Sequence, residues 1–427
     1  MRNAVYMVTV LVAALSLYGP SAAGSLPAPY TPHRFIAGAQ DDALVRRQER
    51  LAQTFPPMPT DNSYLEKIEF RAGIDGAVDE PDLEKQTCRL RFYPRAAGEA
   101  AYSSRLTRLV WESGGMDMDA AIRIAFRKRY QLVLDYCRTA SLLNYHRSLA
   151  MVLQDRETVL RRKVTTDMSH DVGAFLSARD RLADARLTIA ALKSRMEGLC
   201  REIHQAAGFA AEIAFDEGGL IMVDRIDAIL SNLNPALDEN MDLLRLRQKA
   251  NATDAEYRLE IAKKNKLIEF IEISHAIQDD EKGETSLELG IRLPFIGSGR
   301  EALWRCQMSA LRDQGRYEEE KTALLEKTEA MVQGITELIR QYQCREQLFD
   351  RCREDSGGMV SLEKQLSAAG SDPLNLLKLK ETGTLSDIKR CELAFEIRSR
   401  FIELLDITGR LTQKPLTDYL AVVPEPF

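Results

Sequence analysis

The chain has 427 residues, of which 45% are hydrophobic and 29% are charged. This balance is ordinary for a folded protein and argues against an intrinsically disordered one. The 58 Lys and Arg residues and the 64 Asp and Glu residues give a formal net charge of −6. Because the sequence also lacks a long basic segment, we do not expect nucleic acid as a partner.

The N-terminus has the composition of a secretory signal. One arginine is followed by an apolar run over residues 4–17, a Gly-Pro break, and small residues at positions 21–23. We therefore predict that residues 1–24 are a signal peptide, cleaved near Ala23 or Gly24. The alternative is an N-terminal membrane anchor, but the run is shorter than the roughly 20 residues that a spanning helix needs. Export would place the mature chain in a compartment that permits disulfides.

Two halves of the chain repeat each other. In both, alternating apolar residues lead through a proline to a glycine and then to Glu-Ala; these glycines, Gly98 and Gly299, are 299 − 98 = 201 residues apart. Gly208 and Gly409 end later apolar stripes and are also 409 − 208 = 201 residues apart. One spacing at both ends indicates a duplicated unit of helix, strand pair, very long helix, turn and return helix.

The first repeat covers residues 25–208. We predict a short helix, a strand pair at 65–93 and a long helical hairpin at 98–208. The short helix is limited to residues 41–55, because prolines follow it, whereas the second half leaves room for about twice that length. The glycine pair at 114–115 is expected to interrupt the first long helix, since each glycine costs about 1 kcal/mol in a helix interior.

The second repeat covers residues 234–411. It is predicted to contain a helix at 234–266, a strand pair at 267–294 and a helical hairpin at 299–409. A helix of some 70 residues would measure ~100 Å, so it must project from any compact domain and pair with its return helix. Its apolar residues recur at every seventh position, as in a coiled coil: Leu303, Ala310, Tyr317, Leu324, Met331 and Leu338. The remaining segments are a helical connection between the repeats, 209–233, and a C-terminal tail, 412–427.

Alternation of apolar and polar residues predicts four strands, near residues 65–74, 87–93, 267–277 and 285–294. Phe270 beside Ile271 breaks the alternation in the third strand and predicts a bulge there. Such strands suit a sheet with one face in hydrocarbon and the other in water; the alternative is a small sheet packed on the helices. Four strands cannot close around a pore, so several chains would have to pool their strands into one barrel.

Residues 293–300, LPFIGSGR, join a strand to a long helix. This segment resembles the strand-to-helix turn of the outer membrane efflux protein family, the TolC-like channels. Residues 234–264 are similar to the opening of that family's helix before the second strand pair, and residues 171–192 and, more loosely, 370–381 resemble the segments after its periplasmic hairpin turns. The resemblance covers residues 41–411, and the matching positions of the turn motif are Pro294, Gly297, Gly299 and Arg300.

The resemblance implies a mainly α fold with β strands, built from internally duplicated long coiled-coil helical hairpins and four short strands per chain. In that family three chains form a homotrimer with a twelve-stranded β-barrel in the Gram-negative outer membrane and a helical tunnel in the periplasm. The implied function is that of a channel subunit, the exit duct for efflux or type I secretion, which meets a periplasmic adaptor protein and an inner-membrane transporter. The alternative is a periplasmic coiled-coil scaffold or interaction protein without channel activity.

No nucleophile with a base and an acid, no phosphate loop and no metal-ligand spacing stands out, so we expect neither enzymatic activity nor a cofactor. Conduction needs a polar lining instead. The candidates for a barrel lumen are the charged residues of the predicted strands: Lys67, Glu69, Arg71, Arg89, Arg91, Glu288 and Arg292. The alternative is that these are ordinary solvated charges of a sheet.

Two further sets of residues lie in the predicted hairpins. Asp167, Asp171 and Asp372 fall at the hairpin turns, where a trimer would gather three copies around a closing periplasmic tip, so they are candidates for gating; the alternative is that they are turn and cap acids. Cys137 and Cys200 lie 168 − 137 = 31 and 200 − 168 = 32 residues from the first turn. This equal distance permits a disulfide in an antiparallel hairpin; the alternative is free buried thiols.

Overall fold

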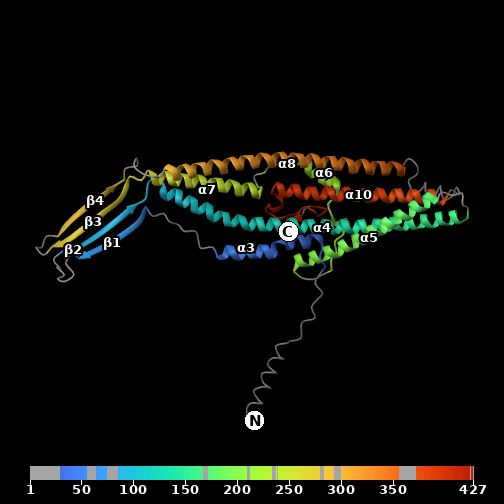
Figure 1. The fold of residues 1–427 in the computed structure, drawn as a ribbon, viewed down its shortest axis with the longest axis horizontal. Helices are drawn as coiled ribbons and strands as arrows, with labels where there is room; N and C mark the ends of the chain where they lie inside the picture. Colours follow the sequence, from blue (N-terminus) through green and yellow to red (C-terminus); the bar gives the residue numbers. More distant parts are fainter. Residues whose placement is uncertain are drawn as a thin grey trace, which may run out of the picture.

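The computed structural model describes the greater part of the mature chain. The described residues are 29–54, 64–74, 85–166, 172–208, 212–232, 237, 239–278, 283–292, 300–354, 372–423 and 425–426. The predicted signal peptide, most of both hairpin turns and most of the LPFIGSGR segment lie outside them. The molecule is elongated, with a sheet at one end and long helices running away from it (Figure 1).

The four predicted strands are present and form one antiparallel sheet. They are β1 (Leu65–Ile74), β2 (Lys85–Pro94), β3 (Ile268–Gln278) and β4 (Glu284–Ile291), in the order β1-β2-β3-β4. The pairing of β2 with β3 joins the strand pairs of the two repeats, with Phe92 opposite Ile271. The register of β3 against β4 shifts between Ile268 and Phe270, so the predicted bulge is confirmed.

Two long antiparallel hairpins make up most of the body. In the first repeat α4 (Glu99–Thr166) returns as α5 (Val172–Ala207); in the second, α8 (Arg300–Glu354) is followed by α10 (Pro373–Ile407). The 68 residues of α4 measure about 100 Å at 1.5 Å per residue. Figure 1 shows α4, α7 and α8 leaving the sheet together, with α5 and α10 toward the far end. The predicted duplication is therefore visible as two hairpins side by side.

The predicted interruption of the first long helix is wrong. The helix α4 runs without a break through positions 114 and 115. The physical reason is that two glycines cost about 2 kcal/mol together, which is small beside the burial of the flanking turns. Ala120 and Ala121 are buried just beyond the pair, and the amide of Gln248 in α7 donates 2.7 Å to the carbonyl oxygen of Leu109 just before it.

The helices before the two strand pairs differ in length, as predicted. In the first half α2 (Pro32–Ala37) and α3 (Ala43–Thr54) are short, whereas α7 (Met241–Lys264) has 24 residues. The predicted start of the second helix at residue 234 is wrong, because the helix begins at Met241. Asn240 decides this start: its side-chain oxygen accepts from the N–H of Leu243 at 2.8 Å and its amide donates to the carbonyl oxygen of Ile407 at 2.5 Å.

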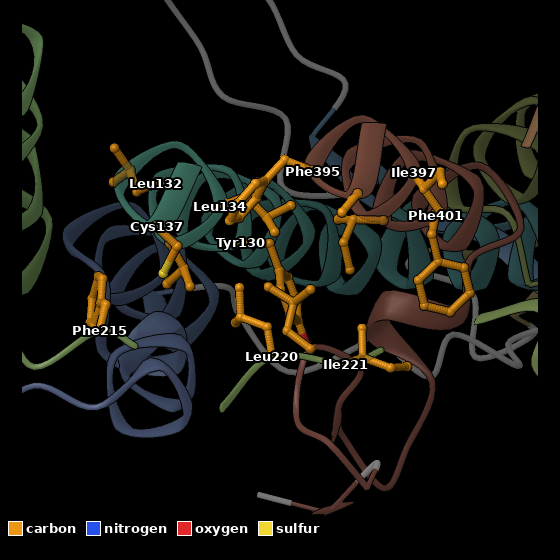
Figure 2. Close-up of a cluster of buried hydrophobic side chains, with 14 of the residues drawn as sticks. Tyr130, Leu132, Leu134, Cys137, Phe215, Leu220, Ile221, Phe395, Ile397 and Phe401 are labelled. Carbon is orange, nitrogen blue, oxygen red and sulfur yellow. The ribbon is translucent and has the colours of Figure 1, made fainter. Parts of the chain in front are cut away.

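The core lies in the middle of the helical body (Figure 2). Tyr130 and Cys137 of α4 meet Phe395 and Phe401 of α10, with Leu220 from the connection between the repeats. That connection holds η2 (Glu217–Gly219) and α6 (Val223–Ser231), and the C-terminal residues form η3 (Arg410–Thr412), β5 (Thr417–Asp418) and β6 (Glu425–Pro426). The predicted tail is thus a folded part of the core, in which Leu420 is fully buried. Within the described residues, no helix has both the length and the apolar content of a membrane span.

Candidate functional site

The sheet has one apolar face that no described part of the chain covers. The register places Phe70, Leu90, Ile273 and Leu287 in one row across all four strands, on the same face as Ile68 and its row. Leu287 is 73% exposed and Phe70 is 67% exposed. In Figure 1 the sheet extends past the ends of the helices. An exposed apolar surface of this kind marks contact with lipid or with another chain.

The opposite face is polar and holds most of the predicted lumen residues. Glu69, Arg91, Glu272 and Glu288 form one row across the four strands. Arg71 and Arg89 face each other in the next row, and Lys67 opposes Tyr93. Six of the seven candidates therefore share this face: Lys67, Glu69, Arg71, Arg89, Arg91 and Glu288. The seventh, Arg292, lies beyond the end of β4, where its N–H donates to the carbonyl oxygen of Leu267 at 2.8 Å.

The charges of the polar face are arranged in pairs. Glu69 accepts hydrogen bonds from Lys67, from Arg71 at 3.0 Å and from the hydroxyl of Tyr93 at 3.2 Å. Arg91 donates to the buried Glu272 at 2.5 Å. By register, the described strands place five cations and four carboxylates on this face, so its formal charges nearly cancel: Lys67, Arg71, Lys85, Arg89 and Arg91 against Glu69, Glu272, Glu284 and Glu288.

The bulge in β3 turns Phe270 onto the polar face. Its ring lies over Gly290 of β4, where a β-carbon would collide with it. The guanidinium of Arg91 sits 4.1 Å from the ring centroid and the ring of Tyr93 lies at 6.4 Å. Sequence reasoning missed Phe270 as a member of this face, whereas alternation does place Glu272 and Tyr93 on the polar side of their strands, although they were not among the lumen candidates. The alternation of β3 on either side of the bulge was the available signal.

Both edges of the sheet are open within the described part of the chain. The strands β1 and β4 each pair on one side only. Their outer N–H and C=O groups therefore remain available to strands of another molecule.

The turn motif is only partly described. Pro294, Gly297 and Gly299 lie outside the described residues, and Arg300 is the exposed first residue of α8. The counterpart in the first repeat is described: Gly98 has a φ of 83°, in the left-handed region that favours glycine, and Glu99 accepts from the N–H of Ala96 at 2.8 Å. This glycine opens α4 directly after the sheet.

Of the three predicted tip acids, Asp372 is described, whereas Asp167 and Asp171 are not. Asp372 caps α10 by accepting from the N–H of Leu374 at 3.1 Å, as the cap alternative expects. Its other oxygen accepts from the ammonium of Lys163 in α4 at 2.7 Å. The hydrogen bond from Lys163 lowers the pKa of the Asp372 carboxyl. Asp372 thus ties the end of the first hairpin to the start of α10.

The predicted disulfide is not formed. Cys137 and Cys200 are both free thiols, which agrees with the alternative. Burial raises the pKa of Cys137 to about 12, so its thiol is a poor nucleophile at neutral pH.

Comparisons with known proteins agree on the fold. No family model matches the sequence, and no curated protein is significantly similar to it. The structure is similar to that of CusC, described in work on transmembrane channel formation, with a TM-score of 0.60 and 12% identity over 92% of this chain and 95% of that one. The outer membrane protein VceC from Vibrio cholerae gives a TM-score of 0.55 and 12% identity over 88% and 96% of the two chains. The outer membrane channel MtrE of Neisseria gonorrhoeae gives a TM-score of 0.53 and 11% identity over 88% of each chain. These identities support the fold alone. The chain has the fold of the TolC-like outer-membrane channel proteins, as its motifs predicted.

Proposed function

We propose that this chain is one of three identical subunits of an outer-membrane channel that serves as an exit duct for efflux or type I secretion. The observation that carries the proposal is the sheet, which has an uncovered apolar face, a polar face and two open edges. A sheet can leave its backbone satisfied in lipid only when it closes into a barrel. In a closed barrel of several copies, the apolar face would meet lipid and the polar face would meet water.

The size of the barrel follows from the number of strands. Two chains would supply eight strands, and the interior of an eight-stranded barrel is just filled by its own side chains. Three chains supply twelve strands and a wider interior. A conduit therefore favours the trimer over the dimer.

The polar face would line this conduit. Because five cations and four carboxylates nearly balance on it, the barrel would discriminate weakly by charge. Selection of the cargo would then belong to the partner that delivers it, an inner-membrane transporter joined through a periplasmic adaptor. Arg292 would lie where the barrel meets the helices.

The helices would form the tunnel in the periplasm. Several large apolar residues of α4 and α8 near the sheet are uncovered in one chain, among them Trp111, Trp304 and Leu311. Neighbouring subunits would cover them. The predicted tip acids Asp167, Asp171 and Asp372 would then gather at the periplasmic end, where Asp372 already bonds Lys163 across the hairpins.

Adjacent positions of β2 provide a test, because they face opposite sides of the sheet. With the seven native cysteines replaced by Ser, cysteine is introduced by Leu90→Cys on the apolar face or by the matched control Arg89→Cys on the polar face. In intact outer membranes, a charged maleimide should label the Arg89→Cys variant and leave the Leu90→Cys variant unlabelled, because the latter side chain would lie in lipid. Equal labelling of both variants would mean that the sheet stands in water, as in a scaffold.

Fractionation and crosslinking address the assembly. We expect the mature chain in the outer membrane, as a trimer that resists mild detergent and migrates differently after heating. A chain that is released from the periplasm as a soluble monomer contradicts the proposal.

The gating role of the tip acids has a separate test. Single-channel conductance is compared between the wild type and the triple variant Asp167→Ala, Asp171→Ala and Asp372→Ala. The matched control removes three exposed carboxylates elsewhere, with Asp180→Ala, Asp184→Ala and Asp224→Ala. A rise in open probability in the first triple variant only is expected; unchanged conductance in both removes the gating role and leaves the channel proposal standing.

A further inference from the structure

A cavity of about 1,200 Å³ opens in the middle of the body, far along the helices from the sheet. It lies between the α2–α3 segment, α4 and the C-terminal end of α5. Six cationic side chains and only two carboxylates, Asp41 and Asp42, belong to its wall. The cations are Arg34, Arg46, Arg47, Arg50, Lys128 and Arg129.

The cations face one another across the cavity. The helix α3 directs Arg46, Arg47 and Arg50 toward the side of α4 that carries Lys128 and Arg129. Positions 46 and 50 are one turn apart and so lie on the same side of α3. Val45 is the buried residue that holds α3 in place. Cations of one helix that face another cationic surface repel it, and this repulsion destabilises the fold unless an anion lies between the two surfaces.

The two carboxylates neutralise a minority of these charges. Asp41 lies 3.4 Å from Arg46, and Asp42 lies 3.8 Å from Arg129. The side chains of Arg47, Arg50 and Lys128 make no hydrogen bond or ion pair within the part of the chain that the structure describes. Three guanidinium or ammonium groups are therefore available to a ligand in the cavity.

The floor of the cavity is a buried arginine. Arg129 is 4% exposed, and its terminal nitrogens donate to the carbonyl oxygens of Phe35 at 2.6 Å and Ala206 at 2.7 Å. Its Nε is buried and has no partner among the described residues. Burial also lowers the pKa of the Arg129 guanidinium, because the charged form has lost water. The carbonyl oxygens of Phe35 in α2 and of Ala206 at the end of α5 compensate this cation, whereas the side chains of Arg47, Arg50 and Lys128 have no such partner in the described part of the chain.

We propose that this cavity is a binding site for a small multivalent anion that carries phosphate or carboxylate groups. Arginine favours such ligands because its planar fork donates two parallel hydrogen bonds to either group. The cavity is larger than a single phosphate, so the ligand carries several anionic groups or is bound with water. The site is separate from the proposed barrel, because none of the cavity residues belongs to the sheet.

Isothermal titration of the purified full-length mature protein at constant ionic strength tests the site, with inorganic pyrophosphate and citrate as separate probes. The variant Arg47→Gln, Arg50→Gln and Lys128→Gln removes three exposed cations of the cavity. The matched control Arg312→Gln, Arg316→Gln and Lys327→Gln removes three exposed cations of α8. Both variants change the net charge equally, and circular dichroism checks that both fold.

We expect saturable binding of about one anion per chain, at least tenfold weaker in the cavity variant and unchanged in the control. Binding of pyrophosphate alone assigns the site to phosphate groups, and binding of citrate with equal affinity assigns it to multivalent anions in general. Absence of saturable binding, or equal weakening in both variants, overturns the proposal. A cavity variant that binds both anions like the wild type but no longer assembles also overturns it, since the cations would then contact a neighbouring subunit.

Discussion

Arg156 of α4 donates a hydrogen bond of 2.5 Å to Glu381 of α10, although the two residues are 225 positions apart and belong to different repeats. Arg181 of α5 donates to the other oxygen of Glu381 at 2.7 Å. The carboxylate is nearly fully buried, so this one group bonds both helices of the first hairpin to α10. No feature of the local sequence marks Glu381, since it lies among other charged residues of a long helix.

Replacing this carboxylate should loosen the contact between the hairpins. Glu381→Gln leaves the guanidinium of Arg156 buried without its counter-ion, and breaking such a pair costs about 3–5 kcal/mol. The matched control is Glu396→Gln, which breaks the exposed pair with Arg400 one turn away and should cost less than about 0.5 kcal/mol. Chemical denaturation measures both changes. Equal, small losses would show that Glu381 does not hold the hairpins together.

The two glycines that end the return helices offer a comparison within one chain. Gly208 and Gly409 occupy equivalent repeat positions and have φ values of 82° and 76°. A β-carbon at Gly208 would meet no atom nearby, whereas one at Gly409 would collide with the backbone of Glu239. We expect Gly208→Ala to cost about 1–2 kcal/mol from the left-handed backbone alone, and Gly409→Ala to cost clearly more. Thermal unfolding of the two variants checks the order, and equal losses would contradict it.

The contact of Phe270 with Gly290 should be required for a stable sheet. Gly290→Ala would displace the ring from Gly290 and from Arg91, at a cost of about 1–3 kcal/mol for overpacking. The control is Gly315→Ala in α8, where a β-carbon meets nothing and helix propensity should gain about 0.5–1 kcal/mol. The temperature at which the assembly dissociates in detergent should fall for the first variant and not for the second. A lower dissociation temperature for Gly315→Ala alone would contradict the role of the contact between Phe270 and Gly290.

The buried Asp418 should make stability depend on pH. Burial raises its pKa above the ordinary 3.8, although the N–H of Leu420 and the ring of His33 bond it. The folded chain therefore holds the proton more tightly than the unfolded chain. The contribution of Asp418 to stability is full below pH 3.8 and is lost as the pH rises through the raised pKa.

The variant Asp418→Asn cannot ionise, so its stability relative to the wild type should increase as the pH rises through this range. Unfolding free energies at several pH values measure the difference between the two proteins. Asp180→Asn, an exposed substitution in α5, serves as the control and should follow the wild type. A difference between Asp418→Asn and wild type that is constant with pH would exclude this role of Asp418.

The elements of the fold were readable from local pattern. Alternation located all four strands, and the glycines at 98, 208 and 409 fixed helix ends that the structure confirms with positive φ values. The cap Asn240 was missed, because it acts with Ile407, a residue 167 positions away. The effect of the glycine pair in α4 was misjudged for a related reason. Helix propensity describes only the local cost of the two glycines, whereas the stabilising contact comes from α7.

By itself, the sequence determined which residues alternate on the strands, which glycines mark the ends of helices at positions 98, 208 and 409, and that the chain is duplicated. These features depend on backbone preferences and on periodicity within one element. Tertiary structure decided that the two strand pairs form one sheet, that Glu69, Arg91, Glu272 and Glu288 align across it, and that Arg129 and the cations of α3 enclose one cavity. The physical reason is that register and packing join residues that can lie more than 200 positions apart, and no local preference encodes which distant partner a side chain meets.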